Sequence, residues 1–125
     1  MVLVDTSVWI RALGNHAPFA GELGRLLDHD EVVGHDLIYG ELLVGDRGGR
    51  KAFLSEYRRM FKATGVPHGE VVQFVEQRGL HGRGLGWIDV HLLASSLVDG
   101  LKFWTADLRL SELAQELGVN HDFGG

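Results

Sequence analysis

The feature that most restricts the fold of this chain is the alternation of short apolar segments with longer amphipathic ones. Residues 2–4, 32–33 and 101–105 are short and largely apolar, without strict polar alternation. Strands of that kind are buried on both faces, as in a parallel sheet covered by helices. The segments between them have apolar residues at helical spacing. We therefore predict an α/β protein with a three-layer sandwich, in which a short, mostly parallel central sheet is flanked by helices.

Glycine, proline and capping residues suggest where the helices begin and end. The pattern predicts helices at residues 8–13, 18–28, 36–44, 50–63, 68–77, 87–98 and 107–117. Asp36 is expected to cap the third helix, and Val66 and Val119 to form brief extra strands. Four glycines within residues 79–86 predict a loop. Since no repeat or linker divides the chain, we expect one domain over residues 1–125.

Composition excludes several classes of protein. The chain has no cysteine, which removes disulfides, zinc–thiolate sites and thiol nucleophiles. No apolar run approaches the roughly 18 residues that a membrane span needs, and the first residues lack the basic region of a signal peptide. We therefore expect a cytoplasmic protein with no membrane partner.

The charge is unevenly distributed along the chain. The formal net charge is −5, yet six of the 12 Lys and Arg residues lie in one 16-residue stretch: Arg47, Arg50, Lys51, Arg58, Arg59 and Lys62. One interpretation is a solvated helix face. The other is a local patch that binds a nucleic-acid backbone on an otherwise acidic protein.

Four acidic residues occupy positions that favour a shared site. Asp5 and Asp107 directly follow predicted strands, and ligands of open α/β sheets bind at the carboxyl ends of strands. Glu41 and Asp89 lie within apolar helical sequence. Each acid alone also has a structural explanation: Asp5 and Asp107 as helix N-caps, Asp89 as a charge that favours the helix dipole, and Glu41 as a half-exposed helix residue. If the four meet, they repel one another unless a cation lies among them, and carboxylate oxygens suit Mg²⁺ or Mn²⁺. Such ions promote phosphodiester hydrolysis.

The segments around these acids resemble, in order, the four motifs of the PIN-domain nucleases, especially the bacterial VapC toxins. The segments are residues 2–10, 38–43, 86–94 and 104–108, and intervals of 36, 48 and 18 residues separate the acids. The resemblance implies a Rossmann-like PIN domain and a Mg²⁺-dependent endoribonuclease, with Mn²⁺ as a substitute ion. It also implies structured RNA such as tRNA or rRNA as substrate, a homodimer, and a VapB-type antitoxin that blocks the site.

The resemblance also implies roles for individual residues. Asp5 and Asp89 are expected to bind the first Mg²⁺ directly, and Glu41 and Asp107 to act through water or on a second ion. Three hydroxyls are expected to support these acids: Thr6 or Ser7 beside the first acid, and Thr105 before the fourth. The sequence departs from the usual pattern after Asp107, where Leu108, Arg109 and Leu110 stand at positions at which an aromatic residue is common.

Four basic residues are candidates for RNA contacts. They are Arg83 in the glycine-rich loop, for which a solvated loop arginine is the alternative, and Arg50, Lys51 and Arg58 in the basic stretch. The three tryptophans, Trp9, Trp87 and Trp104, are expected in the core.

Two other functions compete with a nuclease. One is a catalytically degenerate PIN domain that binds RNA or a protein. The other is a phosphoacceptor receiver module, which is disfavoured because Val4 precedes Asp5 and no lysine follows Thr105.

Overall fold

The computed structural model describes residues 1–122 and contains a parallel three-stranded sheet. The strands are β1 (Val2–Val4), β2 (Val32–Val33) and β3 (Lys102–Trp104), in the order β2-β1-β3. Leu3 pairs with Val33 on one side and with Phe103 on the other. Isolated parallel bridges continue the sheet at both edges, from Gly34 to Lys62 and from Phe103 to Asn120. All carboxyl ends of the strands therefore face the same edge of the sheet.

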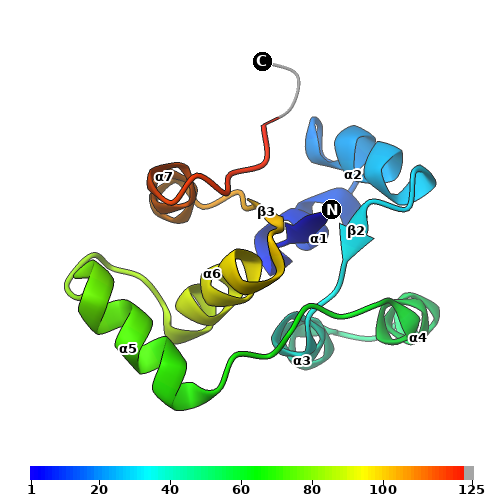
Figure 1. Ribbon diagram of the computed structural model, residues 1–125. Coiled ribbons are helices and arrows are strands. Elements are labelled where there is room, and N and C mark those ends of the chain that lie inside the picture. The colour runs from blue at the N-terminus through cyan, green and yellow to red at the C-terminus, as the bar shows by residue number, and fades with distance from the viewer. Residues whose placement is uncertain (123–125) are drawn as a thin grey trace.

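Helices cover both faces of the sheet. In Figure 1, α2 and α7 lie on one side of the strands, and α3, α4 and α6 lie on the other, with α5 beside α6. The predicted three-layer α/β sandwich is thus confirmed. The helices are α1 (Thr6–Leu13), α2 (Phe19–Asp28), α3 (Asp36–Gly45), α4 (Lys51–Arg59), α5 (His68–Arg78), α6 (Trp87–Asp99) and α7 (Leu108–Glu116).

The core forms where the two helical layers meet the sheet. Leu3 and Val4 of β1 are fully buried, as the central position of that strand requires. Helix α6 approaches closely because Ala94, Ser95 and Ser96 are small, and these residues are buried with Leu92 and Leu93. Each large apolar side chain buried in this way stabilises the fold by roughly 1.5–3 kcal/mol.

Three local predictions were wrong. Helix α4 ends at Arg59 rather than at residue 63, because the backbone becomes extended at Met60 and then pairs with the sheet at Lys62. That bridge takes the place of the strand expected at Val66. The N-cap of α3 is His35, not Asp36, since the His35 ring nitrogen Nδ1 accepts a hydrogen bond from the Leu37 N–H.

Two further predictions concern the edge of the sheet and the ends of the chain. The edge strand expected at Val119 is reduced to the single bridge at Asn120. The predicted domain includes residues 123–125, which lie outside the described residues. Within residues 1–122, no helix is both long and apolar enough to cross a membrane.

Candidate active site

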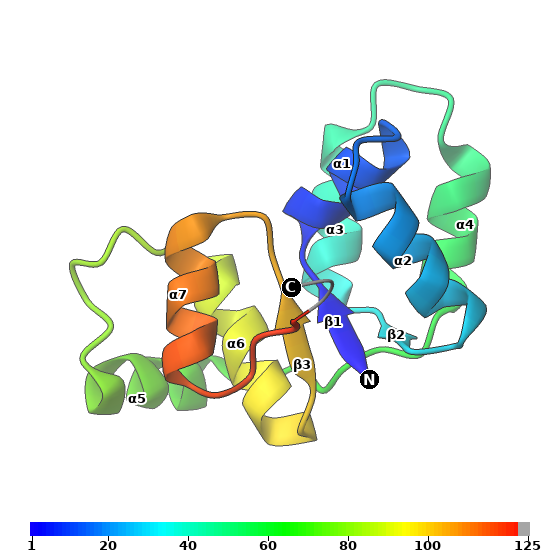
Figure 2. The same ribbon diagram turned by 90° about the horizontal axis from the view of Figure 1, so that it is seen from above.

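The two acids that follow strands lie at the same edge of the sheet, and each also caps a helix. Asp5 ends β1 and accepts a hydrogen bond from the Thr6 N–H at 2.9 Å, which makes it the N-cap of α1. Asp107 follows β3 and accepts from the N–H groups of Arg109 and Leu110 at the start of α7. Figure 2 shows β1 and β3 running side by side toward this edge. Asp5 and Asp107 can therefore cap helices and also belong to one shared site.

Two hydroxyl groups hold the carboxylate of Asp5. Ser7 Oγ and Thr105 Oγ1 each donate to Asp5 Oδ2 at 2.7 Å. The same hydroxyls accept hydrogen bonds from the backbone after β3, Ser7 from the Ala106 N–H and Thr105 from the Asp107 N–H. Asp5 is 6% exposed and Thr105 9%. The ends of β1 and β3 are thus joined through a nearly buried carboxylate.

The remaining two acids reach this edge from helices on the same face of the sheet. Glu41 of α3 accepts a hydrogen bond from Thr6 Oγ1 at 2.6 Å, so a side chain next to Asp5 fixes its position. Asp89, in the first turn of α6, accepts from the Gly86 N–H at 3.1 Å. Burial raises the pKa of Asp89, and the negative charges of Asp5, Glu41 and Asp107 raise it further. The four carboxylates therefore share one electrostatic environment.

Among residues 1–122, no basic side chain pairs with these carboxylates. None of the four forms a salt bridge with a Lys, Arg or His within residues 1–122. In Glu41, Asp89 and Asp107, one oxygen accepts a hydrogen bond and the other accepts none from the described residues. The donor set is all oxygen, which suits a hard divalent cation.

The four acids are near one another but are not a finished coordination shell. Within the described part of the chain, no three His, Cys, Asp or Glu side chains form a group ready to hold a metal ion. The all-oxygen donor set and its negative charge fit a divalent ion in chemistry.

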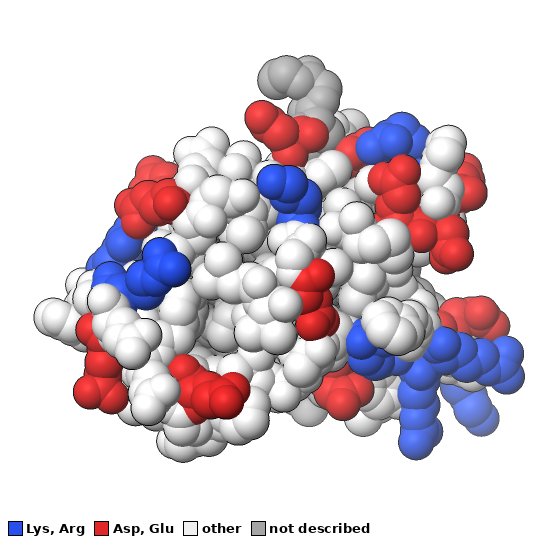
Figure 3. Space-filling model, viewed as in Figure 1, with Lys and Arg blue, Asp and Glu red and all other residues white. Residues whose placement is uncertain are grey.

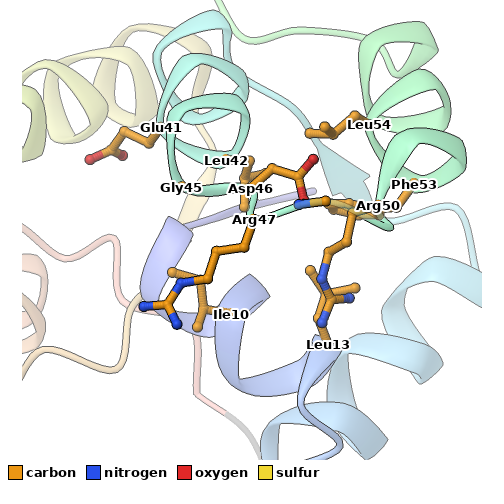
Figure 4. Close-up of a pocket in the computed structure, with 11 residues that line it drawn as sticks. Ile10, Leu13, Glu41, Leu42, Gly45, Asp46, Arg47, Arg50, Phe53 and Leu54 are labelled. Atoms are coloured by element: carbon orange, nitrogen blue, oxygen red, sulfur yellow. The ribbon is translucent and has the colours of Figure 1, made fainter.

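A groove of about 500 Å³ runs from Glu41 between α1, α3 and α4. Figure 4 shows Glu41 at one end, apolar side chains of α1 and α4 on facing walls, and two arginines from the connection between α3 and α4. The apolar walls include Ile10, Leu13, Phe53 and Leu54, and the arginines are Arg47 and Arg50. The groove therefore joins the acidic site to a surface that is both apolar and positively charged.

The predicted RNA-contact residues do not all lie beside the acids. Arg50 lines the groove, whereas Lys51 is exposed at the start of α4 and the Arg58 guanidinium lies 6.0 Å from the ring centre of Tyr39. Figure 3 shows Lys and Arg side chains gathered over α4. Arg83 instead forms a two-point ion pair with Glu116, with both N–O distances 2.9 Å. Since a helix rises 1.5 Å per residue, Glu116 is about 13 Å along α7 from Asp107.

Three residues near the site were not singled out by the sequence. Arg47 belonged only to the basic stretch, and the structure places it in the groove beside Arg50. Arg109 lies two residues after Asp107, with its guanidinium against Gly84 of the glycine-rich loop. Trp87 was expected in the core and is 44% exposed, unlike Trp9 and Trp104, which are buried. The one available signal was the position of Arg109 and Trp87 next to acidic motifs.

The PIN-domain family model matches residues 2–116, which contain all four acids. The chain belongs to the PIN-domain family. It is 41% identical over 120 residues to Ribonuclease VapC32 of Mycobacterium tuberculosis, in the strains CDC 1551 / Oshkosh and H37Rv, covering 95% of this chain and 94% of the relative. This similarity assigns it to the VapC-type PIN domains.

A solved structure supports the fold independently. The crystal structure of PAE2754 from Pyrobaculum aerophilum superposes with a TM-score of 0.54 at 20% sequence identity, covering 94% of this chain and 88% of that one. At this identity the likeness concerns the fold alone.

Proposed function

We propose that this PIN domain is a metal-dependent endoribonuclease toxin that hydrolyses phosphodiester bonds in structured RNA such as tRNA or rRNA. The observation that carries the proposal is the group of four carboxylates at the carboxyl edge of the sheet, which have no basic partner among the described residues. The charges of the other three raise the pKa of Asp89. A chain 41% identical to this one is named a ribonuclease. Repulsion among these carboxylates opposes folding, so their presence favours a role in binding or catalysis.

The proposed cofactor is Mg²⁺, which Mn²⁺ can replace. Asp5 and Asp89 would bind the ion directly, and Glu41 and Asp107 would act through water or a second ion. When bound, the ion supplies an activated water and stabilises the charge that develops on the phosphate. Three hydroxyls are already engaged in fixing carboxylates, so we assign positioning roles to Thr6, Ser7 and Thr105.

The basic surface gives the RNA backbone a place to bind. Arg50 lies in the groove that begins at Glu41, and Lys51 and Arg58 extend the positive surface along α4. Phosphate contacts from arginine and lysine fix the position of a nucleic acid without reading its sequence. Arg83 can contribute only if it leaves Glu116, so we rank it below the residues of α4.

The apolar part of the groove suits a protein partner better than RNA. Ile10 lines the groove and is 60% exposed, and RNA phosphates do not cover apolar side chains. We propose that a VapB-type antitoxin covers the groove and thereby blocks access to Glu41. A homodimer and a cytoplasmic location belong to the same proposal.

The test is RNA cleavage by the purified chain, free of antitoxin, with Mg²⁺ or Mn²⁺ and with EDTA. We expect cleavage only with the metal, and a loss of about 100-fold or more in Asp5→Asn and Asp89→Asn, because each removes a ligand charge while keeping the side-chain shape. Asp28→Asn, an exposed aspartate at the end of α2, is the matched control and should retain full activity.

The outcome also separates the competing function. RNA binding without turnover across several divalent metals would favour a degenerate PIN domain that acts as a binding module. Unchanged cleavage in both aspartate variants would contradict the proposed site.

A further inference from the structure

Trp87 is an exposed aromatic side chain in the first turn of α6, two residues before Asp89. It is 44% exposed, against 4% for Trp9 and 3% for Trp104. Two imidazoles hold its ring, that of His68 at 5.2 Å and that of His91 at 4.8 Å between ring centroids. Because neighbouring rings hold the indole in place and solvent reaches it, an RNA base can stack on it.

A pocket of about 260 Å³ opens next to this ring, between α5, the loop of residues 79–86 and the start of α6. Trp87 lines it together with apolar Val75, Leu80 and Val90 and the glycine-rich loop. Its volume is just below the range of about 300–1,000 Å³ typical of small-molecule sites. The pocket therefore suits one flat heterocycle rather than a peptide helix.

Arg109 places a positive charge at the rim of this pocket. A Cβ at Gly84, which lines the pocket, would lie 2.5 Å from Arg109 Nη1, so the guanidinium lies directly against the loop. Arg109 forms no salt bridge with any carboxylate within residues 1–122, whereas Arg83 on the same loop is paired with Glu116. An exposed guanidinium without an acidic partner is well suited to bind a phosphate.

The pocket adjoins the acidic site without belonging to it. Gly86 lines the pocket, and its N–H donates to the carboxylate of Asp89. Trp87 and Asp89 are roughly 200° apart around the helix axis, so the ring points away from the four carboxylates. A base at Trp87 would therefore belong to a nucleotide next to the cleaved bond rather than to the one at the metal.

We propose that Trp87, this pocket and Arg109 form a subsite for one unpaired nucleotide of an RNA substrate, with the base on Trp87 and the phosphate on Arg109. The inference rests on the proposed ribonuclease function and deepens it. Because a base inside a duplex cannot stack on a side chain, the subsite selects a loop or a bulge over a paired stretch.

The test is steady-state cleavage of a synthetic RNA hairpin by the full chain. Loss of one base–aromatic stack should raise KM about 5- to 150-fold in Trp87→Ala, with a smaller change in kcat. Arg109→Ala should also raise KM, and Trp87→Phe should restore most of the affinity because it keeps an aromatic ring. Val98→Ala, an exposed site at the other end of α6, is the matched control.

Abasic nucleotides, placed one at a time in the hairpin loop, identify the base. In the wild type, one abasic position should weaken binding, and in Trp87→Ala the same change should have no further effect. If the wild type cleaves RNA and Trp87→Ala and Val98→Ala have equal KM values, the subsite is overturned and the nuclease function is not. A KM loss that follows a change in oligomeric state would overturn it too, since the ring would then be a protein contact. A wild type that cleaves no RNA would overturn the nuclease function and the subsite together.

Discussion

Helix α6 carries an aspartate near each end, and the two have opposite surroundings. At the carboxyl end, both oxygens of Asp99 accept hydrogen bonds from Thr64, one from its N–H and one from its hydroxyl, each at 2.7 Å. These bonds lower the pKa of Asp99. At the amino end, burial and three neighbouring carboxylates raise the pKa of Asp89. The surroundings of Asp99 thus stabilise its charged form, whereas those of Asp89 destabilise it.

Asp99 belongs to a polar network whose members are all paired. We call it the His35 network: His35, Thr64, Ser95 and Asp99. The His35 Nδ1 accepts from the Leu37 N–H, which leaves the proton on Nε2, and Nε2 donates to Ser95 Oγ at 3.0 Å. Ser95 in turn donates to the Thr64 carbonyl at 2.6 Å. His35 and Ser95 are buried while Thr64 and Asp99 are exposed, and buried polar groups that are paired in this way help to specify a fold.

The acidic site differs because its charge exceeds what the described side chains compensate. Clusters of perturbed carboxylates of this kind are typical of functional sites. The comparison teaches that burial and polarity alone do not mark a functional site in this molecule. The distinguishing property is that four carboxylates gather with no cationic partner among the described residues, and that three of them, Glu41, Asp89 and Asp107, each keep one oxygen without a donor.

The largest effect on stability is expected at Ser95, which bridges two members of the His35 network. Ser95→Ala leaves the buried His35 N–H unpaired and removes the hydrogen bond to the Thr64 carbonyl, so it should lower the free energy of unfolding by about 1–3 kcal/mol. The neighbouring Ser96→Ala should cost less than about 0.5 kcal/mol, because its hydroxyl only donates to the Leu92 carbonyl of the same helix. Urea denaturation measures both.

RNA cleavage by the two serine variants tests whether the His35 network has only a structural role. RNA cleavage per folded molecule should be the same in Ser95→Ala, Ser96→Ala and the wild type. A selective loss of kcat in Ser95→Ala would mean that the His35 network takes part in the reaction, and the division between the two clusters would be wrong.

A smaller effect is expected from pH. Burial lowers the pKa of His35, while the nearby Asp36 and Asp99 oppose that shift and His91 adds to it. Because the unfolded chain takes up the proton first, stability is complete above about pH 6.5 and falls as pH drops toward the lower folded-state pKa, by at most about 1.4 kcal/mol per pH unit.

His35→Asn tests the source of this dependence, since asparagine can still cap α3 and does not titrate. Its free energy of unfolding should vary less than that of the wild type between about pH 5 and pH 6.5. Equal pH slopes would assign the dependence to other titrating groups, such as the other six histidines or Asp89, whose pKa is raised.

Much of the fold and of the acidic site could be predicted, because both depend on local signals. Short apolar strands followed by Asp5 and Asp107 indicated a parallel sheet with acids at its carboxyl edge, and the structure brings Ser7 and Thr105 onto Asp5. The His35 network could not be predicted, since its members are far apart in sequence and share no motif.

The errors have the same physical origin. Trp87 looked like a core residue because tryptophan is usually buried, yet α5 leaves its ring partly open. The end of α4 depended on pairing between Lys62 and Gly34, a contact that spacing along the chain does not encode.

The most direct test of the acidic site is thermal unfolding with and without Mn²⁺. An ion that binds only the folded wild type should stabilise it by about 2.7 kcal/mol at 100 times its Kd. Asp89→Asn should show almost no rise in Tm with Mn²⁺, while in EDTA its Tm should equal or slightly exceed that of the wild type, because one repelling charge is gone. Equal rises in both proteins, or no rise in the wild type, would contradict a cation site built from these four carboxylates.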